Sequence, residues 1–446
     1  MSTANPVNSK SHLDPAAVYA LAANRKGEIV DHPDWLMLGA SGITSRRPLS
    51  GELIPLPPGS RLFFLPDCPA LGWDPESARA KPIERLEDFD DGASLQGVAA
   101  FLPPAYSRFL LPAVAWHKTD YVLPLWAYTA VGWSDEIDGY VVAACRIDEN
   151  RQWEPEFFDD RKVVAGVEEK LARYPDNRLI DHLSRCAVDY HCFAAKNFFL
   201  QRWECPLPVS PSCNANCVGC LSFQEEDKVA QGESCPASHD RISFVPSLEE
   251  LLEVARPHIT VADNPVLSFG QGCEGDPILQ GKRIAEFARA VRRETSAGTL
   301  NVNTNASLPR QVAEIAAAGI DAIRVSLNSA RKESYLPYYR PRGYKFDDVL
   351  ESLRLAKAGG MHLAINLLVL PGVTDAADEV AALCELIAEY RIDQVQMRNL
   401  CIDPRQYLDL YPRERFTRPL GIKRLLERLR QEFPELKIGY FNRYLG

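Results

Sequence analysis

From about residue 203 onward, short apolar segments alternate with amphipathic ones. Six of the apolar segments have the length and composition of buried strands: 206–209, 266–270, 300–306, 322–328, 362–370 and 394–400. The segments between them carry apolar residues at helical spacing, and two end at glycines that suit a helix C-terminus, Gly319 and Gly359. This alternation predicts βαβ units around a parallel sheet. We therefore expect residues 201–446 to form a partial (β/α)6-type parallel barrel of the α/β class, to which the segment LKIGYFN can add a strand.

The first 200 residues follow a different pattern. Residues up to about 60 are rich in Pro, Gly and Ser, which predicts loop with little regular structure. Residues 122–131 and 139–146 are β-branched or apolar runs on either side of a polar turn, which predicts two strands. Apolar residues at helical spacing between about 162 and 202 predict helices. We therefore expect a smaller α+β domain over residues 1–200, and no motif in it indicates a chemistry.

Composition excludes several classes of protein. The chain has 446 residues, of which 46% are hydrophobic and 25% charged, and these values exclude a disordered, collagen-like or disulfide-scaffold chain. The net charge of −10 argues against a broad electrostatic grip on nucleic acid. The sequence has no apolar run of about 20 residues, which a membrane span needs, and its first residues lack the apolar region of a signal peptide. We therefore expect a cytoplasmic protein, where clustered cysteines indicate metal binding or catalysis.

Three of the twelve cysteines lie together directly after the first predicted strand. Cys213, Cys217 and Cys220 have the spacing C-x3-C-x2-C, with small and polar residues between them. Three thiolates on one tight loop can hold three corners of a [4Fe–4S] cluster. A fourth iron without a cysteine is open to a substrate or cofactor, whereas an electron carrier uses four cysteines.

This motif, just past the first strand of a βα-repeat barrel, resembles that of the radical S-adenosylmethionine (SAM) superfamily. The resemblance covers roughly residues 205–440. It implies a [4Fe–4S] cluster whose open iron is chelated by the amino and carboxylate groups of SAM. It also implies an activity: reductive cleavage of SAM gives a 5′-deoxyadenosyl radical, which abstracts hydrogen from a substrate. The implied partners are a substrate, which the sequence does not identify, and an electron donor such as flavodoxin or ferredoxin.

Later strand ends match other segments of the family in order. The second strand leads into FGQGCEGDPIL, which resembles the family's Gly-Gly-Glu segment. Here Gly272 allows close backbone approach, and either Asp276 or Glu274 supplies a carboxylate for the amino group of SAM. The resemblance implies further SAM contacts from Asn303, Asn305, Ser326, Asn328, Asn366 and Arg398. Gly219 departs from the family pattern, because an aromatic residue that packs near the adenine often stands at that position.

The same residues have alternative interpretations. A non-catalytic protein with structural zinc is one, with the ligands Cys217, Cys220, Cys235 and His239, although this set leaves Cys213 unused. A non-catalytic iron–sulfur carrier is another. The asparagines and the serine at the strand ends are also suited to cap the helices that follow, and an arginine on a strand can simply pair with a carboxylate.

Four further cysteines and a tyrosine-rich segment remain. Cys186 and Cys192 lie on a predicted helix among apolar residues, which favours core packing. Cys273 and Cys401 lie at the predicted carboxyl ends of the second and sixth strands, where a thiol can return a hydrogen atom to a substrate radical or hold an intermediate; packing is the alternative. Residues 335–344 contain four tyrosines and form either a rigid packed loop or a lid.

Overall fold

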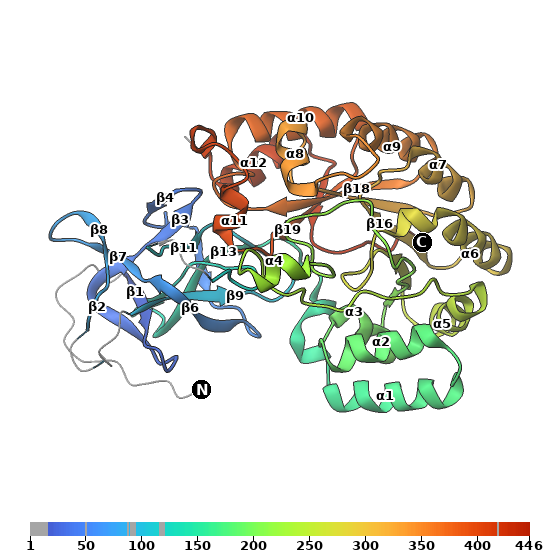
Figure 1. Ribbon diagram of the computed structural model, residues 1–446, viewed down its shortest axis with the longest axis horizontal. Helices are drawn as coiled ribbons and strands as arrows, with labels where there is room; N and C mark the ends of the chain where they lie inside the picture. Colours follow the sequence, from blue (N-terminus) through green and yellow to red (C-terminus); the bar gives the residue numbers. More distant parts are fainter. Residues whose placement is uncertain (1–16, 50, 87–88, 90–94, 116–120, 417–418) are drawn as a thin grey trace. The chain divides into compact units, whose positions relative to one another are not determined.

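The computed structural model describes residues 17–446 apart from 50, 87–88, 90–94, 116–120 and 417–418. The chain divides into two compact units (Figure 1). Unit 1 comprises Met1–Glu149, Val369–Ala381 and Arg398–Pro434, and unit 2 comprises Asn150–Leu368, Ala382–Met397 and Glu435–Gly446. The division after Glu149 differs from the expected one at residue 200, since three helices that precede the barrel belong with unit 2.

The sheet of unit 2 has seven strands in chain order, and each pair with a defined register is parallel. The strands are β14 (Glu204–Pro206), β15 (Val266–Phe269), β16 (Thr299–Thr304), β17 (Ala322–Leu327), β18 (His362–Val369), β19 (Gln394–Asn399) and β20 (Lys437–Gly439). The sheet curls into a half-barrel with its helices along the outside (Figure 1). The predicted partial parallel barrel is thus confirmed, and LKIGYFN supplies β20. The first strand ends at Pro206, because the next N–H after Leu207 that faces β15, that of Val209, donates to the Glu274 carboxylate at 2.8 Å instead of to the ladder.

Helices of the two units follow the amphipathic segments of the sequence. Before the barrel lie α1 (Asp160–Arg173), α2 (Arg178–Val188) and α3 (Phe193–Phe199). After β14 come α4 (Glu226–Ala230), α5 (Leu248–Val261), α6 (Gly281–Glu294), α7 (Pro309–Ala317), α8 (Lys332–Tyr339), α9 (Phe346–Ala358), α10 (Ala377–Tyr390), α11 (Pro404–Leu408) and α12 (Ile422–Glu432). Four single turns of 3-10 helix occur at Arg151–Trp153, Pro155–Phe157, Pro277–Gln280 and Arg413–Phe416. Among the described residues, no helix is both long and apolar enough to cross a bilayer.

The start of α5 shows why these helices begin where they do. Ser247 accepts a hydrogen bond from the Glu250 N–H, and the Glu250 carboxylate accepts one from the Ser247 N–H, which is a capping box. The inner face of α6 is apolar, with Ile284, Phe287 and Val291 buried. Burial of such a stripe against the sheet, rather than helix propensity alone, stabilises each helix.

Unit 1 is built on antiparallel strands. Its larger sheet has the order β10-β13-β12-β1-β2-β7-β8, with β5 on β13, β9 on β1 and β6 on β9, and a smaller sheet has the order β11-β3-β4. The strands are β1 (Val18–Ala23), β2 (Ile29–Met37), β3 (Gly39–Ser41), β4 (Thr44–Arg46), β5 (Leu53–Pro55), β6 (Arg61–Pro69), β7 (Leu71–Asp74), β8 (Arg79–Pro82), β9 (Gln96–Phe101), β10 (Tyr106–Arg108), β11 (Leu111–Pro112), β12 (Val131–Ser134) and β13 (Gly139–Arg146).

Two predictions for unit 1 are wrong. Residues 17–60 contain five strands rather than mostly loop. β1 is almost wholly buried, so it lacks the polar alternation that marks a half-exposed strand. Residues 122–131 do not form a strand either, since Pro124 interrupts the run and β12 begins only at Val131. The other predicted strand, 139–146, coincides with β13.

A buried arginine joins separate segments of unit 1. Arg108 donates hydrogen bonds to the carbonyls of Tyr128 at 3.1 Å, Val369 at 3.2 Å and Leu400 at 2.8 Å. Its guanidinium is fully buried, and this burial lowers its pKa to about 10. Hydrogen bonds from one side chain therefore hold the two later segments of the chain to the N-terminal part of unit 1.

Candidate cofactor-binding site

The three clustered cysteines lie on a loop of unit 2 that follows β14. The loop backbone is fixed by the last turn of α8, because the Asn216 N–H donates to the Tyr339 carbonyl at 3.0 Å and the Val218 N–H donates to the Tyr338 carbonyl at 3.1 Å. All three cysteines are half-buried and free. Their sulfur atoms do not all lie within 4.8 Å of one another, so in the described part of the chain they do not form a compact group for a single ion.

One asparagine inside the motif ties the loop to the end of β16. Asn214 donates to Ser307 Oγ at 2.8 Å, and its carbonyl oxygen accepts from Asn305 Nδ2 at 2.9 Å. The predicted residue Asn305 therefore contacts the cysteine loop. Sequence reasoning missed Asn214 and Ser307, although the position of Asn214 next to Cys213 was a signal that could have found it.

Burial and charge set the protonation of the loop thiols. Burial, reinforced by the nearby Asp276 charge, raises the pKa of Cys213 to about 12. Burial also raises the pKa of Cys217 well above its ordinary value. Without a cation these two groups are therefore neutral thiols, and binding of a cation would release their protons. Arg241 also donates a hydrogen bond to Cys220 Sγ at 3.7 Å, which places a positive charge beside this sulfur.

Glu274 joins the segment just before the cysteine loop to the turn after β15. Its carboxylate accepts hydrogen bonds from the N–H groups of Val209 at 2.8 Å, Ser210 at 3.0 Å, Gly270 at 2.7 Å and Gln271 at 2.8 Å. Burial raises the pKa of Glu274 to about 7, while these four donors act in the opposite direction. Four bonds use the acceptor capacity of a carboxylate. Glu274 therefore holds the chain together rather than offering a free acceptor.

Asp276 lies beside the cysteines, and fewer hydrogen bonds occupy its carboxylate than occupy that of Glu274. Its carboxylate accepts from Ile278 N–H at 3.1 Å, Thr304 Oγ1 at 2.5 Å and Asn305 N–H at 2.7 Å. Burial raises its pKa above the ordinary value, and the hydrogen bonds oppose this. Asp276 thus caps the turn that follows β15 and retains acceptor capacity close to Cys213.

The glycines of this segment have different roles. A Cβ atom at Gly275 would lie 1.9 Å from the Ser212 carbonyl oxygen, so only glycine allows the turn to approach the cysteine loop. Gly270 has φ +84°, and a Cβ there would lie 1.9 Å from the Asn303 oxygen. At Gly272 a Cβ would meet only Leu221, at 3.8 Å, so the chain itself does not require glycine there.

The remaining polar candidates of unit 2 fall into two sets. Asn303 donates to the Gly270 carbonyl at 3.1 Å, and Asn328 donates to the Ser334 carbonyl at 2.9 Å, so each stabilises the chain at a strand end. Ser326 and Asn366 form a pair across β17 and β18, with Asn366 Nδ2 donating to Ser326 Oγ at 3.2 Å. The Asn366 Oδ1 atom is buried and has no partner among the described residues. This atom is an acceptor that a bound ligand can satisfy.

Two of the predicted site residues, Arg398 and Cys401, lie in unit 1. Arg398 is on β19 and is half-buried. Cys401 follows this strand, and its thiol donates to the Asn399 carbonyl at 3.6 Å. Burial raises the pKa of Cys401, which keeps it a neutral thiol. The predicted cofactor contact of Arg398 and the predicted catalytic role of Cys401 remain predictions.

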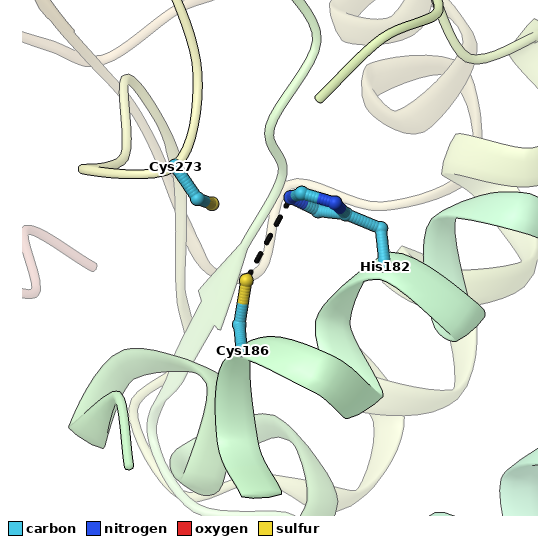
Figure 2. Close-up of side chains that lie close together, drawn as sticks. All are labelled: His182, Cys186 and Cys273. Atoms are coloured by element: carbon cyan, nitrogen blue, oxygen red, sulfur yellow. Dashed lines mark hydrogen bonds between the residues drawn. The ribbon is translucent and has the colours of Figure 1, made fainter. Parts of the chain in front are cut away.

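The structure does not assemble the alternative zinc site. Among the described residues, one group of three or more His, Cys, Asp or Glu side chains lies within the reach of a single ion, and it consists of His182, Cys186 and Cys273 (Figure 2). Cys217, Cys220, Cys235 and His239 do not form such a group in the described part of the chain. Cys186 and Cys273, predicted on separate grounds, thus lie together.

The tyrosine-rich segment is packed rather than raised as a lid. Tyr335 stacks on Tyr339 with ring centroids 4.3 Å apart, and the hydroxyls of Tyr335 and Tyr344 are 2.9 Å apart. Tyr335, Tyr338, Tyr339 and Tyr344 are all buried. The segment forms most of α8 and fixes the carbonyls that hold the cysteine loop.

Comparisons with known proteins agree with this arrangement. The model of the Radical SAM superfamily matches residues 207–387. The GTP 3′,8-cyclase of Chlorobaculum tepidum is 26% identical over 239 residues, which cover 52% of this chain and 62% of that protein. The GTP 3′,8-cyclase of Heliobacterium modesticaldum is 32% identical over 120 residues, which cover 26% of this chain and 35% of that protein. The chain thus spans less than two thirds of the length of these curated relatives.

A search of solved structures matched Streptococcus suis SuiB bound to S-adenosylmethionine, at 14% identity and a TM-score of 0.37 over 56% of this chain and 55% of that one. The FeFe-hydrogenase maturase HydG from Carboxydothermus hydrogenoformans matches at 14% identity and a TM-score of 0.37 over 63% of this chain and 70% of that one. The family match begins at Leu207, directly after β14, and contains the three-cysteine motif, the Asp276 segment and β15 to β18. Residues 207–387 therefore form a radical SAM domain.

Proposed function

We propose that this chain is a radical SAM enzyme in which Cys213, Cys217 and Cys220 bind a [4Fe–4S] cluster. The proposed activity is reductive cleavage of SAM to a 5′-deoxyadenosyl radical that abstracts hydrogen from a substrate. When bound, the cluster supplies the electron that breaks the sulfonium bond. The observation that carries the proposal is the loop itself, which presents three soft donors within eight residues at the carboxyl end of the first barrel strand.

The polar groups around the loop support a position for SAM. Asp276 has acceptor capacity beside Cys213, which suits the SAM ammonium. The buried Asn366 Oδ1 atom, paired through its amide with Ser326, suits a donor of the same ligand. Gly272 leaves room for close backbone approach. Asn303, Asn305 and Asn328 act in this proposal mainly as positioning residues, since their side chains contact other parts of the chain.

The proposal includes a reductant and a location but no named substrate. All twelve cysteines are free thiols, which supports a reducing compartment such as the cytoplasm and a reductant such as flavodoxin or ferredoxin. The reaction of the curated relatives, GTP 3′,8-cyclisation, is not extended to this chain, because the match covers only 52% of the chain and 62% of that protein.

The decisive experiment is anaerobic incubation of the reconstituted full chain with SAM and dithionite. We expect 5′-deoxyadenosine and methionine in equal amounts, detected by chromatography with mass spectrometry. A protein that contains the cluster but forms no 5′-deoxyadenosine under these conditions would be an iron–sulfur carrier, and the proposal would fail. The three-cysteine Ala variant provides the background rate.

Replacement of Asp276 tests the proposed SAM contact. Asp276→Asn removes one charge-assisted interaction with the ammonium, worth roughly 1.5–3 kcal/mol, which corresponds to about a tenfold to hundredfold loss of SAM affinity. Equilibrium binding of SAM to the reconstituted protein measures this. Asp393→Asn is the matched control, because Asp393 accepts from the Leu363 N–H and from Lys357 at the amino ends of the strands. Equal loss of affinity in both variants would contradict the assignment of Asp276.

A further inference from the structure

A second group of soft ligands lies in unit 2 outside the cysteine loop. His182 and Cys186 are four residues apart on α2, so both project from the same face of the helix. Cys273 lies on the turn that follows β15, far later in the sequence. Figure 2 shows the two thiols and the imidazole pointing toward one another. Their ligand atoms all lie within 4.8 Å of one another, and Cys186 Sγ is 3.7 Å from His182 Nε2.

These separations suit one tetrahedral ion. A zinc ion with Zn–S bonds of about 2.3 Å and a Zn–N bond of about 2.05 Å places its sulfur and nitrogen ligands about 3.6 Å apart. The observed 3.7 Å between Cys186 Sγ and His182 Nε2 therefore needs almost no rearrangement. Two thiolates and an imidazole are also the donors that zinc prefers. Within the described residues no fourth such side chain joins the group, so a water or another small ligand would complete the tetrahedron.

The surroundings favour a bound cation over a set of plain core residues. His182, Cys186 and Cys273 are 4%, 1% and 5% exposed, so their polar atoms are shielded from water. Cysteine binds a metal ion as the thiolate, so binding of a divalent cation would release the thiol protons.

We propose that His182, Cys186 and Cys273 bind a zinc-class divalent cation that is separate from the cysteine loop. The ion would connect α2 to the turn after β15. The Cys273 carbonyl already accepts a hydrogen bond from the Ile242 N–H at 2.8 Å, so the ion would fix the same residue through its side chain. Glu274, the next residue, joins the turn after β15 to the segment just before the cysteine loop. The ion would therefore act as a structural support for the SAM-binding segment.

Metal analysis of the full chain tests this proposal. We expect about one zinc per chain after expression with added zinc, measured by mass spectrometry of the purified protein. Cys186→Ser, Cys273→Ser and His182→Ala should each lower the zinc content at least tenfold. Cys384→Ser, which replaces another buried thiol on α10, should leave it unchanged. Zinc that stays bound in the first three variants would overturn the proposal.

A second measurement uses the unmodified protein, so it tests the proposal even if a variant does not fold. X-ray absorption at the zinc edge of the unmodified protein should show two sulfur ligands and one imidazole. Cobalt(II) offered in place of zinc should give the charge-transfer absorption of cobalt thiolates. Loss of zinc only on replacement of Cys217, Cys220, Cys235 or His239 would assign the ion to the other set and overturn the proposal. A Cys186–Cys273 disulfide in place of zinc, found by peptide mass mapping of anaerobically purified protein, would also overturn it.

Discussion

The cysteine loop and the group of His182, Cys186 and Cys273 lie in the same unit but hold their thiols in different ways. The loop is half-buried, its thiols do not all lie within 4.8 Å of one another, and it is fixed by hydrogen bonds that its N–H groups donate to α8 carbonyls and by Asn214. The second group is buried, compact, and fixed by the packing of a helix against a turn. A less compact, partly accessible set suits a cluster with an open iron, and a compact, buried set suits one ion.

The largest expected effect is on metal content: replacing a loop cysteine should remove iron but leave zinc in place. Replacing any one of Cys213, Cys217 and Cys220 by Ala should abolish or severely reduce cluster loading after anaerobic reconstitution, since two irons then lack a protein ligand. The same variants should keep their zinc, because no loop thiol belongs to the buried group. Iron, sulfide and zinc analysis with visible absorption measures both. If the triple variant still bound four irons, the assignment of the loop would be wrong.

Glu274 follows Cys273 of the buried group and accepts hydrogen bonds from the segment before the cysteine loop. Its replacement should therefore disturb both the buried group and the loop. Glu274→Gln places an amide NH2 against backbone N–H donors that the carboxylate now satisfies. We expect a loss of about 3–5 kcal/mol in the free energy of unfolding and incomplete cluster loading. Urea denaturation and iron analysis measure these. The control is Glu351→Gln on α9, where the carboxylate pairs with Arg354 at the surface. A loss below about 1 kcal/mol would show that the four bonds are not important for stability.

The sequence predicts the cysteine loop but not the buried group of His182, Cys186 and Cys273, because only the loop ligands are close together along the chain. The loop ligands lie within eight residues, so their spacing alone reports the geometry. The ligands of the buried group come from α2 and from the turn after β15, and only the fold brings them together. The sequence also could not rank Asp276 against Glu274. That choice depends on which backbone N–H groups point at each carboxylate, and the four donors to Glu274 come from two separate segments.

The fold was predictable to different degrees in the two units. In unit 2 the strands recur between amphipathic helices, so β15 to β19 were located to within one or two residues even though β16 and β19 contain polar residues. In unit 1, β5 and β11 are short and contain proline, so they lack the length and composition of a typical strand. β1 is buried along nearly its whole length, so it lacks the alternation of apolar and polar residues. The pairing of β5 with β13 depends on contacts far apart in the sequence, which no local pattern encodes.

A pH experiment distinguishes His182 from another buried histidine, His258 on α5. Burial lowers the pKa of His258 to about 4, and its Nε2 atom has no hydrogen-bond partner among the described residues. Because its ordinary pKa is about 6.5, the unfolded chain takes up the proton first as the pH falls. The contribution of neutral His258 to the free energy of unfolding should therefore be fully present above pH 6.5. It should decrease by roughly 3 kcal/mol as the pH falls to about 4.

Denaturant midpoints at pH 7 and pH 4.5 measure this dependence for the native chain and for His258→Gln. The variant should lose much of the decrease between the two pH values while its zinc content stays normal, since His258 is not in the buried group. His191→Asn is the control, because His191 is exposed and has φ +50°, a conformation that Asn tolerates. If His258→Gln lost its zinc instead, the two histidines would have been assigned the wrong roles.

The smallest expected effect concerns the charge beside the loop. Arg241 donates to Cys220 Sγ and also contacts the Phe223 ring. Reduction adds negative charge to a cluster on these thiolates, so the guanidinium should stabilise the reduced form more than the oxidised form. Arg241→Gln should therefore lower the midpoint potential by on the order of 50 mV, which is close to 1 kcal/mol for one electron. Redox titration followed by electron paramagnetic resonance measures it, with Lys228→Gln as the control, because Lys228 pairs with Glu225 at the surface. An unchanged potential in Arg241→Gln would mean that water screens this charge from the loop.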